Sequence, residues 1–163
     1  MNTTTSRSLA LVPLFAALLA VLGLIPKIDL PLGVPITLQT LGVMLAGCLL
    51  GPRRGLQAVL LFLAAVAMGL PLLSGGRGGV GVFFAPSAGY LVGFAFGALA
   101  TGLVMSRLPA NTPRRAAVSA LIASVVGGLL VVHVCGVIGL VNLANLSWSQ
   151  ALWGTLVFVP GDL

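Results

Sequence analysis

Residues 41–70, LGVMLAGCLLGPRRGLQAVLLFLAAVAMGL, contain two apolar runs separated by the pentapeptide GPRRG at 51–55. The first run covers 38–50 and is rather short, and the second covers 56–70. Proline interrupts a helix, and a pair of arginines is costly inside a bilayer. We therefore expect two membrane-spanning helices that are joined by a short polar turn.

The composition of the 163-residue chain indicates a membrane protein. Hydrophobic residues make up 59% of the chain, charged residues make up 6%, and the mean hydropathy is +1.20. A soluble domain carries about 25% charged residues. We expect a single integral membrane domain over residues 1–163. The net charge of +6 does not indicate nucleic-acid binding, because the basic residues are scattered singly or in pairs.

Three further apolar runs cover 9–25, 90–105 and 116–141. None of the runs alternates between polar and apolar residues, so an outer-membrane barrel is excluded. The first run is too long for a removable signal peptide and lacks a small-residue cleavage site. The sequence therefore predicts an all-α, polytopic helical bundle with five spans and the start of a sixth.

The basic residues predict the orientation of the bundle. Six of the eight fall on one predicted side: Arg7, Arg53, Arg54, Arg107, Arg114 and Arg115. The other side holds Arg77 and Lys27, and Asp29 offsets the charge of Lys27. Because positive residues concentrate in cytoplasmic loops, we expect a cytoplasmic N-terminus and outward-facing connections at 26–37 and 71–88. The predicted location is the cytoplasmic (inner) membrane of a bacterium.

Small residues recur at four-residue spacing in the spans, where they let helix backbones approach closely. The two longest series are Gly89, Gly93, Gly97 and Thr101, and Ala116, Ala120, Ser124 and Gly128. We expect both series to pack inside the bundle. A shorter stripe in the first span, Ala16 and Ala20, faces either the bundle or another subunit, and the sequence leaves both alternatives open.

The sequence offers little for catalysis. It has no Walker motif, one histidine, two distant cysteines and two acidic residues, so neither a metal cluster nor a catalytic triad can be assembled. We expect no enzyme activity, no metal site and no cofactor. His133 is expected to be a satisfied polar group inside the bundle, with a ligand-binding role as the alternative. Cys48 and Cys135 lie near opposite membrane faces and are expected to be packing residues rather than a disulfide.

Polar groups gather instead on the predicted outer side. They are Thr37, Gln39, Thr40, Arg77, Ser87, Tyr90 and Asp162. Polar groups that converge between apolar helices are typical of a small-molecule pocket. The glycines of SGGRGG at 74–79 allow a loop to approach a ligand closely, although the same residues are compatible with a plain flexible loop.

The final heptapeptide, VFVPGDL at 157–163, has the features of a helix start. Proline is favoured at the first helical position, and an acid in the first turn is stabilised by the helix dipole. We therefore expect Asp162 at the outer mouth of a sixth span and the chain to be truncated there. Residues 147–158 are expected to form a short interfacial helix, with Trp148 and Trp153 at the headgroups.

Three blocks resemble the BioY family, the biotin-binding S component of energy-coupling-factor (ECF) vitamin transporters. They are VPITLQTLGVMLAGCLLGPRRG at 34–55, GLPLLSGGRGGVGVFFAPSAGYLVGF at 69–94 and FVPGDL at 158–163. The resemblance implies a six-helix bundle that takes up biotin as its substrate. It also implies a transmembrane coupling subunit and cytoplasmic ATPase subunits as partners, docked in part through Ala16 and Ala20. The candidate substrate-binding residues are Thr37, Gln39, Arg77, Tyr90 and Asp162.

The chain departs from the family pattern in two places. The family usually has Pro-Thr-Gly-Gly-Tyr where this chain has PSAGY at 86–90, and its last motif continues to a lysine beyond the aspartate. Three alternatives stay open. The chain is an S component for another vitamin, a biotin transporter that works without a dedicated partner, or a small helical assembly or regulatory subunit that transports nothing.

Overall fold

The computed structural model describes residues 3–25, 28–29 and 35–156, and most of them are helical. The main helices are α1 (Thr3–Leu24), α2 (Gln39–Ala67), α3 (Ala88–Arg107), α4 (Pro113–Ser124), α5 (Val132–Leu143) and α6 (Trp148–Leu156). The π-helix η2 (Val125–Val131) joins α4 to α5, and the 3₁₀-helix η1 (Val80–Phe84) precedes α3. The strands β1 (Ile28–Asp29) and β2 (Pro35–Ile36) form one short antiparallel pair.

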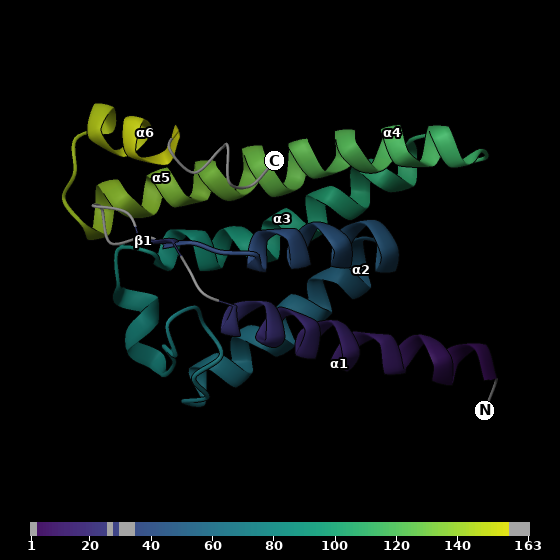
Figure 1. Cartoon of the computed structure of the whole chain (residues 1–163), viewed down its shortest axis with the longest axis horizontal. Coiled ribbons are helices and arrows are strands. Elements are labelled where there is room, and N and C mark those ends of the chain that lie inside the picture. The colour runs from purple at the N-terminus through teal and green to yellow at the C-terminus, as the bar shows by residue number, and fades with distance from the viewer. Residues whose placement is uncertain (1–2, 26–27, 30–34, 157–163) are drawn as a thin grey trace.

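The helices lie side by side across the molecule (Figure 1). Helix α1 packs on α2, α2 on α3, and α3 on the continuous segment α4–η2–α5, while α6 packs against α5. Among the described residues, three helical segments are long and apolar enough to cross a membrane: Gln39–Ala67, Ala88–Arg107 and Pro113–Leu143. Ala10–Leu24 is a shorter apolar helix. The expectation of an all-helical membrane bundle is thus confirmed in its fold class.

Helix α2 doubles back on itself at Gly51. This residue has φ 78° and ψ 178°, a left-handed conformation that glycine adopts without a steric penalty. A straight helix of 29 residues would be about 44 Å long. Yet the Gln39 side chain, at the start of α2, lies 3.2 Å from the carbonyl oxygen of Leu72, just beyond its end. The two expected runs, 38–50 and 56–70, are therefore two arms of one kinked helix.

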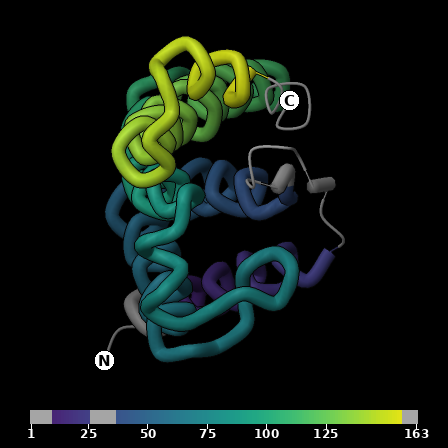
Figure 2. The backbone as a smooth tube through the Cα atoms, turned by 90° about the vertical axis from the view of Figure 1, so that its left-hand side faces the viewer, coloured from purple at the N-terminus to yellow at the C-terminus, as the bar shows by residue number. Residues whose placement is uncertain are grey.

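The two ends of the bundle differ in chemistry. We call residues 51–54 and 107–115 the arginine end, since they include Arg53, Arg54, Arg107, Arg114 and Arg115. Helix α1 starts at this end of the molecule (Figure 1). We call residues 35–38, 68–87 and 144–147 the loop end, which faces the viewer in Figure 2. The structure therefore gathers these five arginines at one end of the bundle, as expected.

The glycine series of α3 lies against the α4–η2–α5 segment, as expected. A Cβ added at Gly89 would lie 2.7 Å from Gly139 Cα, and one at Gly93 would lie 3.0 Å from Val132 Cα. At Gly97 the same atom would lie 3.0 Å from the carbonyl oxygen of Gly127. Side chains larger than hydrogen would push these backbones apart, so the glycines set the distance between α3 and α5.

The second series and the short stripe also face inward. On the α4–η2 segment, Ser124 Oγ lies 3.8 Å from Cys48 Sγ, and a Cβ at Gly128 would meet the side chain of Met44. These contacts join the segment to the first arm of α2. On α1, Ala16 is only 8% exposed and belongs to the hydrophobic core, while Ala20 packs against that core. Within this chain, the Ala16 side chain therefore contacts the bundle.

Candidate functional site

The segment after α2 forms a fixed turn at the loop end. Gly75, Gly76 and Gly79 have φ values of 78°, 70° and 84°, which glycine adopts readily. The Leu73 amide donates to the Arg77 carbonyl at 3.0 Å, and the Gly79 amide donates to the Val66 carbonyl at 2.8 Å. The second bond ties the turn to the last part of α2. The SGGRGG sequence therefore has a defined backbone rather than that of a plain flexible loop.

This turn presents Arg77 beside the start of α3. The guanidinium Nε donates to the Ser74 carbonyl at 3.3 Å, and Nη1 donates to Ser87 Oγ at 3.4 Å. Ser87 is buried and directly precedes α3, whose first turn carries Tyr90. A guanidinium has five N–H donors. The half-buried Arg77 thus keeps donors for an additional acceptor.

Gln39 is the most deeply placed of the candidate residues, with 2% of its surface exposed. Its Nε2 donates to the carbonyl oxygens of Leu19 in α1 and of Leu72 in the loop, each at 3.2 Å. The side chain therefore ties α1, α2 and the 68–87 segment together. Because the amide nitrogen is engaged, its capacity to bind a ligand rests on the carbonyl oxygen, which is an acceptor.

Thr37 and Thr40 accompany Gln39 at the start of α2. Thr37 Oγ1 accepts a hydrogen bond from the backbone N–H of Gln39 at 3.2 Å, and Thr37 is half-buried. Its hydroxyl hydrogen stays available to a ligand. Thr40 is buried, with 6% of its surface exposed.

Tyr90 reaches the opposite side of the loop end, where α3, α5 and α6 meet. It is 8% exposed, and its hydroxyl lies 3.0 Å from Thr155 Oγ1 of α6. Its ring meets the His133 ring edge-on, with 6.0 Å between centroids. A Cβ at Gly136 would collide with the Tyr90 ring, so this glycine makes room for the aromatic side chain.

His133 is buried in α5, and its Nδ1 lies 2.8 Å from the Leu129 carbonyl oxygen one turn earlier. The structure thus places His133 inside the bundle with one ring nitrogen at hydrogen-bond distance from a carbonyl oxygen, and the choice between a packing role and a ligand-binding role stays a prediction. Together with Thr155 and the tryptophans of α6, His133 lines a groove of about 890 Å³ between α5 and α6. Thr155 could not be found by sequence reasoning, because a single threonine in a mixed segment has no distinguishing pattern.

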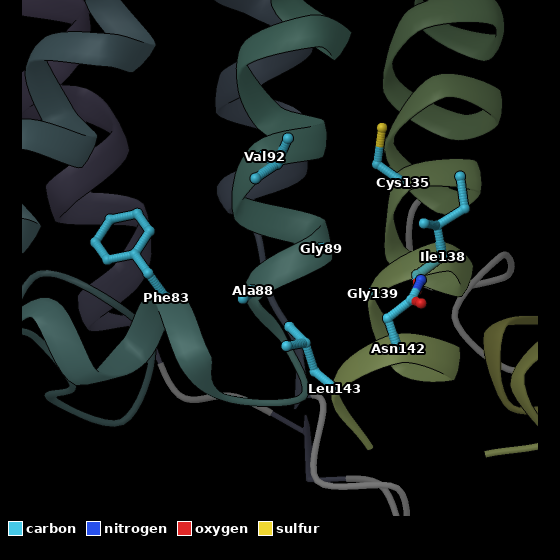
Figure 3. Close-up of a pocket in the computed structure, with 9 residues that line it drawn as sticks. All are labelled: Phe83, Ala88, Gly89, Val92, Cys135, Ile138, Gly139, Asn142 and Leu143. Atoms are coloured by element: carbon cyan, nitrogen blue, oxygen red, sulfur yellow. The ribbon is translucent and has the colours of Figure 1, made fainter. Parts of the chain in front are cut away.

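A second cavity, of about 290 Å³, opens between α3 and α5 near the loop end (Figure 3). Its lining consists of Phe83, Ala88, Gly89, Val92, Cys135, Ile138, Gly139, Asn142 and Leu143. The lining is mostly apolar, and the Asn142 amide donates to the Ile138 carbonyl at 2.7 Å. Its α3 wall starts at Ala88, next to Ser87, so the cavity adjoins the polar residues of the loop end.

The structure thus places Thr37, Gln39, Arg77 and Tyr90 at one end of the bundle, on three connected elements. It also adds Ser74, a buried residue whose hydroxyl has no hydrogen-bond partner within the described part of the chain. Asp162 lies outside the described residues. In the ranges that are described, no three His, Cys, Asp or Glu side chains gather into a possible metal site. The arrangement suits a neutral or anionic small molecule that both accepts and donates hydrogen bonds.

These features define a class: a polytopic helical membrane protein with a polar site at one end of the bundle. The chain matches the BioY family over residues 1–163 and belongs to it. A biotin transporter BioY of Rhizobium etli is 46% identical over 162 residues, covering 98% of this chain and 87% of that protein. The biotin transporter BioY of Rhodobacter capsulatus is 48% identical over 168 residues, covering 96% of this chain and 86% of that protein.

A solved structure is similar to this chain as well. The crystal structure of the S component for biotin from an ECF-type ABC transporter matches with a TM-score of 0.89 and 34% sequence identity. The match covers 99% of this chain and 86% of that one. The resemblance seen in the sequence blocks is therefore confirmed at the level of both family and fold.

Replacing Gln39 by glutamate tests its bridging role. The substitution Gln39→Glu removes both donors and sets a carboxylate against the carbonyl oxygens of Leu19 and Leu72. We expect the free energy of unfolding, measured by titration with SDS in mixed micelles, to fall by about 1–3 kcal/mol. Gln57→Glu makes the same chemical change at an exposed position of α2 and should have little effect. Equal effects at both positions would contradict the bridging role.

Proposed function

We propose that this chain is the biotin-binding S component of an ECF-type vitamin transporter and mediates biotin uptake. The observation that carries the proposal is the fold match to a biotin S component, with a TM-score of 0.89 over 99% of the chain. The relatives from Rhizobium etli and Rhodobacter capsulatus are both named biotin transporters, which supports the same substrate. The whole chain then acts as a single transmembrane substrate-binding domain, without enzyme activity and without a cofactor.

The loop end supplies groups that complement biotin. The fused rings carry a ureido group with two N–H donors and one carbonyl acceptor, and the tail ends in a carboxylate. Each of these groups costs about 1–3 kcal/mol if it is buried without a partner. The spare donors of Arg77 suit the carboxylate or the ureido carbonyl, and such charge-assisted bonds are the stronger kind. The Gln39 side-chain carbonyl oxygen suits a ureido N–H. The Thr37 hydroxyl can pair with either a donor or an acceptor of the ligand.

Two further residues complete the proposed site. Asp162 is an acceptor when ionised, so it suits the ureido N–H donors, and a helix N-terminus would favour its charged form. Tyr90 offers an aromatic face to the rings. Its hydroxyl and that of Thr155, 3.0 Å apart, tie α3 to α6 on that side of the site.

For the membrane arrangement we propose five spans and the start of a sixth in the cytoplasmic membrane of a bacterium, with a cytoplasmic N-terminus. The two arms of α2 then count as separate spans, although 12 and 16 residues are fewer than the roughly 20 that a full crossing takes. The arginine end faces the cytoplasm, in keeping with the positive-inside rule, and the loop end faces outward.

The proposed partners are a transmembrane coupling subunit and cytoplasmic ATPase subunits, as in an ECF-type transporter. On α1 the inward position of Ala16 leaves Ala20 at the border of the exposed face. That face carries a groove of about 410 Å³ lined by Leu14, Phe15, Ala17, Leu18 and Val21. We propose that a partner helix lies on this face of α1, with the small side chain of Ala17 permitting close approach.

Biotin binding to the purified protein in detergent tests the function. The substitutions Arg77→Gln and Asp162→Asn should each weaken binding by roughly ten- to a hundredfold, since each removes a charge-assisted hydrogen bond. Isothermal titration calorimetry measures the affinity. Arg54→Gln removes one charge at the arginine end and should leave it unchanged.

The outcomes separate the alternatives. Asparagine still caps a helix well. Unchanged biotin affinity in a folded Asp162→Asn variant would therefore leave Asp162 as a helix cap only. A protein that binds another vitamin but no biotin would be an S component of different specificity. Binding of no vitamin at all would favour an assembly or regulatory subunit.

Cysteine labelling tests the orientation. In a background with Cys48→Ala and Cys135→Ala, the variants Val80→Cys and Asn111→Cys place single thiols at exposed positions of opposite ends. We expect a membrane-impermeant maleimide applied to intact cells to label Val80→Cys and to spare Asn111→Cys until the cells are opened. Labelling in the reverse pattern would contradict the proposed orientation.

A further inference from the structure

A cavity of about 460 Å³ lies at the arginine end, between the α3–α4 connection and α4 itself. It is lined by Leu108, Pro109, Arg114, Arg115, Val118, Ser119 and Ile122. Two arginine residues therefore line one recess together with apolar residues. The cavity lies at the other end of the bundle from the proposed biotin site.

The positive charge at this end has no counterpart within the described part of the chain. Only two acidic residues occur in the whole sequence, Asp29 and Asp162. Asp29 lies in β1, at the far end of the bundle from the start of α4 (Figure 1), and Asp162 is outside the described residues. Arg115 Nη1 donates to Asn111 Oδ1 at 3.2 Å, which is a neutral acceptor. Within the described part of the chain, no carboxylate therefore neutralises these arginines.

The walls of the cavity are held in place before any ligand arrives. Ser119 Oγ is buried and donates to the Pro109 carbonyl at 2.8 Å, which fastens the connection to α4. Thr112 caps α4 by accepting from the Arg115 amide at 3.3 Å, and its carbonyl accepts from the Ala116 amide at 2.8 Å. A recess that is already shaped loses less entropy when it is filled.

The α4 wall of the cavity continues into an exposed apolar surface. Val118 and Ile122 are 51% and 44% exposed and lie one helical turn apart on α4. An occupant with an anionic head and an apolar tail would meet arginine at one end and these side chains along its length. A soluble anion would leave the apolar wall uncovered.

We propose that this cavity binds the phosphodiester headgroup of an anionic membrane phospholipid. Arg114 and Arg115 donate to the phosphate oxygens, a pairing for which the planar guanidinium is well suited. One acyl chain lies along Val118 and Ile122. Basic recesses at the ends of transmembrane helices are suited to such headgroups. The bound lipid would supply the counter-charge that the chain lacks and would fix the depth of the arginine end in the bilayer.

Native mass spectrometry of the detergent-purified protein, titrated with phosphatidylglycerol and with phosphatidylcholine, measures this binding. The unmodified protein should prefer phosphatidylglycerol. The double variant Arg114→Gln/Arg115→Gln should bind phosphatidylglycerol about tenfold more weakly, because it loses charge-assisted hydrogen bonds. The matched variant Arg53→Gln/Arg54→Gln has the same net charge and is altered at the same end, outside the cavity, so its affinity should change by less than about twofold.

Three results would overturn the proposal. Equal losses in the two double variants would indicate diffuse attraction by net charge. Tight binding of glycerol 3-phosphate, which has no acyl chain, would indicate a site for a soluble phosphate. Unchanged phosphatidylglycerol affinity in the Arg114/Arg115 variant would leave these arginines for an acidic surface of a partner protein. All four arginines are exposed, so folding should be preserved, and the thermal midpoint of the helical circular dichroism signal checks it.

Discussion

The reversal of α2 at Gly51 is the constraint on which the rest of the structure depends. It brings Gln39, at the start of the helix, next to Leu72, which lies beyond its end. The side-chain Nε2 of Gln39 donates a hydrogen bond to the Leu72 carbonyl oxygen at 3.2 Å. A Cβ at Gly102 would collide with Pro52, so α3 packs directly on the reversal. Since GPRRG thus lies at the arginine end, residues 35–38 and 68–87 both come to the loop end. The polar residues of the proposed site are gathered there by the same turn.

Close helix packing by small residues then fixes the distances across this framework. In lipid there is little hydrophobic force between helices, so close backbone contact and buried hydrogen bonds carry the association. The glycines of α3 allow α5 to approach, and Gly136 makes room for Tyr90. Tyr90 and Gln39 bond to elements on opposite sides of the loop end, Thr155 and Leu72. Packing and site geometry are therefore parts of one arrangement, with the candidate site residues at one end and the arginines at the other.

The sequence predicted the apolar runs, their helical class, the inward glycine series and the grouping of arginines, because each depends on a local pattern of spacing. It did not predict features that depend on contacts between distant segments. Examples are the engagement of the Gln39 amide by two carbonyl groups and the Tyr90–Thr155 hydrogen bond. The inward position of Ala16 was left open, since a two-residue stripe fits either face. The widened π-helix at Val125–Val131 also has no sequence pattern of its own, because it depends on distant segments: Gly127 packs against the backbone of α3 and Gly128 against the Met44 side chain of α2.

The reversal of α2 can be measured directly as a distance. Spin labels at Leu41 and Met68, both exposed, are introduced after Cys48→Ala and Cys135→Ala, and double electron–electron resonance gives their separation in nanodiscs. The two arms pack side by side with helix axes about 8–10 Å apart, so the label distance should be on the order of 20 Å or less. A helix that continued straight through Gly51 would separate the labels by about 40 Å. A distance near the longer value would contradict the reversal, and with it the gathering of Gln39 and the 68–87 segment at one end.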